Sequence, residues 1–120
     1  MTGLLKKRWK EWLKINRLKE RIEDILEVPY ISEEDTVMDG SFTLEPVISD
    51  GLRGNGVIQS GIDYYAVNLF YFDKKELVVV TKRLCSTLLQ DGMICDTPSY
   101  VYEREADIWR GMLRVGIIGG

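Results

Sequence analysis

The stretch from Tyr64 to Ile118 constrains the fold of this 120-residue chain more than any other part. It predicts a long aromatic strand over residues 64–72, a helix over 74–91 and a closing hairpin over 100–118. Asp73 is placed to cap the helix, because its side-chain oxygen can accept a hydrogen bond from the first turn. The block carries long strands and no catalytic group in an evident setting, which indicates a part of an assembly rather than an enzyme.

The strand over 64–72 is apolar on both of its faces. Successive side chains of a strand point to opposite sides of the sheet, and Asn68 is the only amide side chain among aromatic and aliphatic ones. One side carries Tyr65, Val67, Leu69 and Tyr71, and the other carries Tyr64, Ala66, Phe70 and Phe72. Such a strand lies either at the centre of a sheet covered on both sides or against another subunit.

The first part of the chain predicts a helix and an edge strand. Apolar residues recur at near-helical spacing over 4–27, and the helix ends before Pro29, because the residue before a proline avoids the helical conformation. A polar connector over 30–41 leads to a strand over 42–48, in which Pro46 indicates an edge position.

These elements predict an α+β fold. It has an N-terminal amphipathic helix, a mostly antiparallel sheet of about four strands, a second helix packed on the sheet and a C-terminal β-hairpin. We expect a single domain over 1–120, with a basic amphipathic helix over 1–28 and the sheet with its helix over 42–118.

Composition restricts the classes of function. The chain has no histidine, which removes the commonest general base and the commonest transition-metal ligand. No apolar run approaches the ~20 residues that cross a bilayer, and the first helix lacks the pattern of a signal peptide. We therefore expect a cytoplasmic protein without metal or cofactor. Cys85, on the apolar side of the second helix, and Cys95, in the turn after it, are expected to be plain thiols.

Charge is divided unevenly along the chain. Residues 1–21 carry eight Lys or Arg against two Glu, and the remaining residues carry eight basic and seventeen acidic side chains. The basic helix fits a solvated face, contact with an acidic neighbouring subunit, or direct contact with DNA. Trp9 and Trp12 suit a buried anchor at an interface, whereas no known DNA-binding motif is present.

Three other segments contain residue types that occur in binding or catalytic sites. The glycine-rich residues 51–56 lack the lysine and hydroxyl that follow the last glycine of a phosphate loop, so we expect a recognition loop or a plain turn. Acidic clusters at 33–35 and 103–107 fall where turns are expected, which favours solvated charge over paired catalytic carboxylates. The aromatic strand lacks the interleaved Lys and Arg of a base-stacking surface.

From Gly61 to Ile118 the chain resembles the tail terminator proteins of long-tailed bacteriophages. The likeness rests on the aromatic strand Tyr64–Asp73, the acidic-capped helix Lys74–Gln90 and the closing hairpin SYVYEREADIWRGMLRVGII. The resemblance implies a small α/β subunit that forms a hexameric ring. In that family the ring caps the tail tube, ends its polymerisation and offers the surface to which the head docks.

The resemblance also implies partners and a location. The partners are other copies of the chain, the tail tube protein and a head-completion or connector protein. DNA passes through the lumen only as cargo, and no membrane is involved. The place is the tail or neck of the virion, assembled in the cytoplasm of the bacterial host.

For such a ring protein we expect contacts at the glycine-rich loop, the hairpin tip and the first helix, and no catalytic residue. The residues are Trp9, Trp12, Arg53, Gly54, Asn55, Gly56, Val57, Ile58, Glu103, Arg104, Glu105 and Asp107. One alternative is another head–tail connector or completion protein, which shares the size and the assembly logic. The others are a nucleic-acid-binding module and a soluble hydrolase.

Overall fold

The computed structural model describes residues 3–32, 35–47 and 62–118, with residues 3–12 described by their helical backbone only. In chain order the elements are α1 (Gly3–Leu26), β1 (Ser41–Pro46), β2 (Ile62–Tyr71), α2 (Lys74–Gln90), β3 (Ile94–Cys95), β4 (Ser99–Glu103) and β5 (Ile108–Ile118). The strands form one antiparallel sheet in the order β1-β2-β5-β3, and β4 also pairs with β5. The predicted α+β fold is confirmed, with five strands in place of about four.

The fifth strand is β3, which the sequence did not predict. Cys95 was expected in a turn, and this expectation was wrong, because Cys95 pairs with Val115 and Ile94 pairs with Gly116. A strand of two residues is too short to show any periodicity in the sequence. Its position brings Cys95 against the sheet, beside α2.

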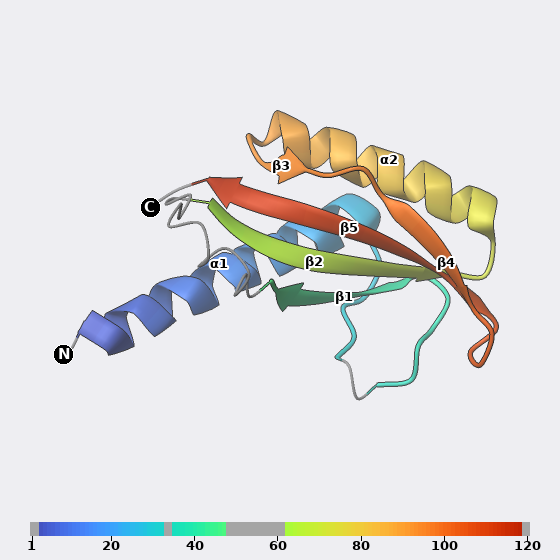
Figure 1. Cartoon of the computed structure of the whole chain (residues 1–120), viewed down its shortest axis with the longest axis horizontal. Coiled ribbons are helices and arrows are strands. Elements are labelled where there is room, and N and C mark those ends of the chain that lie inside the picture. Colours follow the sequence, from blue (N-terminus) through green and yellow to red (C-terminus); the bar gives the residue numbers. More distant parts are fainter. Residues whose placement is uncertain (1–2, 33–34, 48–61, 119–120) are drawn as a thin grey trace, which may run out of the picture.

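Both helices pack on one face of the sheet (Figure 1). Alternate side chains of β2 and β5 point toward the helices and form the main core. The fully buried members are Leu18, Ile22, Phe42, Val67, Leu69, Leu77, Leu84, Leu88 and Val115. As expected, Asp73 caps α2, and its carboxylate accepts a hydrogen bond from the backbone amide of Lys75.

The second face of the sheet is covered at one end by the chain itself. The connector after α1 folds over the end of the sheet, so that Ile31 and Val37 pack against Phe70 and Ile108 in a small second core. The backbone amide of Ile31 donates to the carbonyl of Phe42 at 2.8 Å and holds the connector along the edge strand β1. The connector thus explains why Phe70 is buried on a side of β2 that no helix covers.

Candidate interaction surface

The other end of the second face is not covered by any described element. Cross-strand partners share a face of the sheet, and the register pairs Ala66 with Arg114 and Asn68 with Met112. We call this surface the open half of the sheet, and define it as Ile62, Tyr64, Ala66, Ile94, Met112, Arg114 and Ile118. Five of these side chains are partly buried, Arg114 and Ile118 are exposed, and 62% of Ile118 is accessible to solvent. The open half is a mainly apolar surface on the central strands.

Tyr64 is fixed on the open half by a glycine on the neighbouring strand. A Cβ atom added to Gly116 would lie 2.9 Å from Cε1 of Tyr64 and 3.2 Å from Cγ2 of Ile62, so the ring occupies the space that a side chain would need. The guanidinium carbon of Arg114 lies 6.0 Å from the centre of the same ring. Tyr64 therefore packs against Gly116, with the guanidinium of Arg114 over its ring.

A hollow separates the open half from the connector. Its volume is about 220 Å³, and its apolar lining consists of Ile31, Val37 and Phe70. Asp35 and Glu45 add two carboxylates to the lining, and Arg110 adds one guanidinium. The hollow thus combines apolar side chains with a small excess of negative charge.

The two arginines on this face have acidic partners within the chain. Nε of Arg110 lies 3.0 Å from Oε1 of Glu103, in an ion pair that lacks the alignment of a hydrogen bond. Nε of Arg114 lies 3.8 Å from Oδ2 of Asp96. The positive charge on the face is therefore matched locally.

The hairpin tip, which the sequence predicted as a contact site, lies at the opposite end of the sheet from the open half. Glu103 is paired with Arg110, and the hydroxyl of Tyr102 donates to the carboxylate of Asp107, which raises the pKa of Tyr102. Arg104 and Glu105 are exposed at the turn. Two of the three tip carboxylates thus have partners, and the tip as a contact stays a prediction.

The other predicted contact residues lie outside the described part of the chain. The loop residues Arg53, Gly54, Asn55, Gly56, Val57 and Ile58 fall within 48–61. Trp9 and Trp12 lie in α1, where the structure describes the backbone alone. These contacts therefore stay predictions. The described residues add the open half, of which Tyr64 and Ala66 were recognised as apolar from the sequence.

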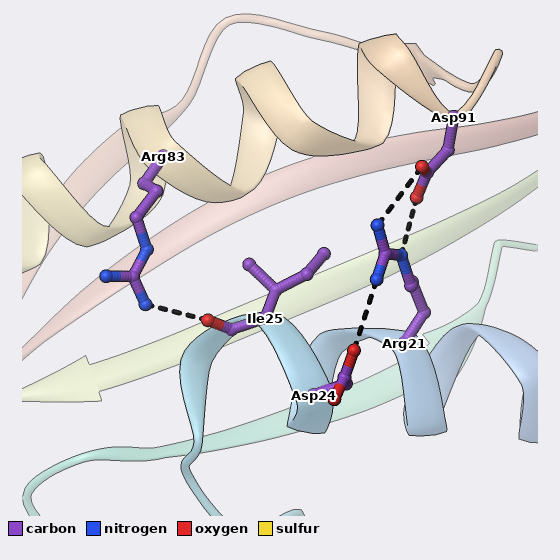
Figure 2. A network of polar contacts seen from close by, with 5 residues as sticks. All are labelled: Arg21, Asp24, Ile25, Arg83 and Asp91. Atoms are coloured by element: carbon purple, nitrogen blue, oxygen red, sulfur yellow. Dashed lines mark hydrogen bonds and ion pairs between the residues drawn. The ribbon is translucent and has the colours of Figure 1, made fainter.

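The ends of the two helices are held by reciprocal arginines (Figure 2). Arg83 of α2 donates to the carbonyl oxygen of Ile25 at the C-terminus of α1, at 2.7 Å. Arg21 of α1 binds both carboxylate oxygens of Asp91, the C-cap of α2, at 2.7 and 3.2 Å, and also reaches Asp24. The hydrogen bond from Arg21 lowers the pKa of Asp91. Cations at both helix C-termini complement the helix dipoles and fix the direction of α1.

Two cysteines meet between α2 and β3. Both Cys85 and Cys95 are free thiols packed against the main core. Burial, a hydrogen bond with the Cys85 side chain and the charge of Asp96 raise the pKa of Cys95 to about 12. Because the thiolate is the reactive form, this environment makes Cys95 unreactive near neutral pH.

The described residues contain no group of three or more Cys, Asp or Glu side chains placed to hold a metal ion. Neither described helix is long and apolar enough to span a membrane. Comparisons with protein-family models, curated proteins and solved structures found no match to this chain. A functional assignment therefore depends on the surfaces of the chain itself.

Proposed function

We propose that this chain is a structural subunit of a phage tail or neck. Copies of it form a ring that caps the tail tube, ends tube polymerisation and offers the surface for head joining. The observation that carries the proposal is the open half of the sheet, where Tyr64, Met112 and Ile118 leave an apolar surface on the central strands. Exposed apolar surfaces of this kind mark sites of protein association. The resemblance of residues 61–118 to tail terminators gives the surface its context.

The test is a tube-capping assay. Purified chain is added to purified tail tube protein during polymerisation, and negative-stain images record tube lengths and tube ends. We expect shorter tubes with a ring at one end. Tubes of unchanged length with bare ends would contradict the proposal.

A different neck component, such as a head-completion or connector protein, is the second candidate, since it needs the same kind of exposed apolar surface. It predicts rings that bind heads but leave tube growth unchanged. A nucleic-acid-binding module predicts instead a salt-dependent shift of duplex DNA in a gel, with no effect on tubes or heads.

A further inference from the structure

The first part of α1 extends beyond the sheet (Figure 1). The helix has 24 residues, which corresponds to roughly 36 Å at 1.5 Å per residue. Among its described side chains, it meets the main core only through Ile15, Leu18, Ile22, Ile25 and Leu26. Residues 3–12, of which the structure describes the backbone only, form the first part of this helix. We call these residues the overhang.

The sequence of the overhang does not continue the stripe that α1 buries in its own core. On a helix of 3.6 residues per turn, positions 5, 9 and 12 share one face, which is rotated by roughly 100° from positions 18, 22 and 26. The change of phase occurs at the spacing of six between positions 12 and 18. Apolar residues occupy both sets of positions. In the sequence, the apolar positions of the overhang therefore have a helical phase of their own, different from that of the core positions.

Charge indicates the kind of surface that fits the overhang. Residues 3–12 contain four Lys or Arg and one Glu, whereas residues 22–52 contain nine Asp or Glu and no Lys or Arg. From this segment, Asp35 and Glu45 line the hollow beside the open half. Arg110, the one cation among the described lining residues, is paired with Glu103. An apolar and acidic surface is complementary to a basic amphipathic helix.

A contact between these two surfaces has to join two copies of the chain. α1 packs on one face of the sheet, the open half lies on the opposite face, and the arginines at the helix ends fix the direction of α1. We propose that the overhang of one copy packs across the open half of the sheet of the next copy. Such a head-to-tail contact generates a ring when the rotation closes. The inference rests on the proposed function and names the subunit contact of that ring.

Self-association of charge variants of the full chain tests this contact. The first variant, K6E/K7E/K10E, reverses the charge of the overhang, and the second, A66R, places a bulky cation in the middle of the open half. The matched control, K74E/K75E/K82E, reverses three exposed lysines on α2. Far-UV circular dichroism and thermal unfolding confirm that each variant is folded.

Sedimentation velocity at about 50 mM salt, where charges are weakly screened, measures the outcome. We expect the wild type and the control to associate, and both test variants to associate at least about tenfold more weakly, a difference of roughly 1.4 kcal/mol. A monomeric wild type under these conditions, or test variants that associate like the control, would overturn the contact. So would a wild type that stays monomeric and binds duplex DNA through the overhang.

Zero-length carbodiimide crosslinking locates the contact without any substitution. A mixture of unlabelled and ¹⁵N-labelled wild-type chains is crosslinked, and mass spectrometry reads the isotopes of each linked peptide pair. We expect Lys6, Lys7 or Lys10 to be joined to Asp35 or Glu45 in pairs of mixed isotope composition. Pairs from a single chain only would overturn the inference.

The inference and the proposed function fail in different assays. If chains that form this contact leave the tubes uncapped, the proposed tail function is wrong and the contact stands. If the chain caps tubes and both test variants associate as strongly as the control, the proposed contact is wrong and the tail function stands.

Discussion

Gly111 is the residue that sets the distance between α2 and the sheet. A Cβ atom at this position would lie 3.0 Å from Cδ1 and 3.4 Å from Cγ of Leu77, whose side chain is fully buried. We expect Gly111→Ala to lower the free energy of unfolding by about 1–3 kcal/mol, because overpacked core side chains leave their rotamers. Urea unfolding measures the change.

A second variant tests the cause of this loss by shortening Leu77, the residue that the new Cβ atom would meet. Leu77→Val removes the methyl groups nearest the new Cβ, so the double variant should be more stable than the sum of the two single effects predicts. Strict additivity would show that the strain arises elsewhere.

Cys95 gives a second prediction, one that depends on pH. Its raised pKa favours the thiol in the folded state, so this contribution to stability is complete below about pH 9, the ordinary value, and is lost as pH rises toward about 12. Iodoacetamide should therefore label Cys95 more slowly in the native chain than in urea at about pH 8.5, as measured by peptide mass spectrometry. Cys95→Ala should lose less stability than the wild type between about pH 9 and 11. Equal labelling rates in the two states would contradict the assignment.

Among the elements, the C-terminus of α1 is where local signals are least favourable. Glu23, Asp24 and Glu27 lie near this end, where the helix dipole disfavours negative charge. The helix ends at Leu26, and the next residue, Glu27, has φ 55°. The hydrogen bond from Arg83 to Ile25 compensates from the other helix. We expect Arg83→Met to cost about 0.5–1.5 kcal/mol of unfolding free energy, the usual net value of such a bond. Lys82→Met, at the neighbouring exposed position, should cost far less, and equal losses for the two variants would exclude the role of Arg83.

Elements with local signals were predictable from the sequence, and those that depend on distant residues were not. The cap at Asp73, the alternation of β2 and the edge position of Pro46 are read from neighbouring residues, and each was found where expected. Thr81 lies within the apolar stripe of α2 and is fully buried, because its hydroxyl donates to the carbonyl of Leu77 and accepts from Tyr100. No local pattern in the sequence shows that Thr81 has these hydrogen-bond partners. In the same way, the open half follows from the β2–β5 register, and the sequence showed only that β2 is apolar on both sides.

At the scale of the whole molecule, the sheet is covered by three different parts of the chain. Two helices bury one face, the connector covers one end of the other face, and no described element covers the open half. The connector contributes few apolar residues, so it should open without unfolding of the main core. This arrangement separates a rigid scaffold from a more easily opened border beside the proposed contact.

Amide hydrogen exchange tests this division. The amide of Ile31, bonded to the carbonyl of Phe42, should exchange through local opening and be less protected than those of Val67 and Leu113 in the central strands. Val37→Ala trims only the small second core, so it should speed exchange at Ile31 and leave the central strands unchanged. Leu88→Ala, in the main core, should instead speed exchange at all three amides, because it lowers global stability by about 2–5 kcal/mol. If Val37→Ala also accelerated Val67 and Leu113 to the same extent, the connector would belong to the cooperative core and could not adjust separately when a partner binds.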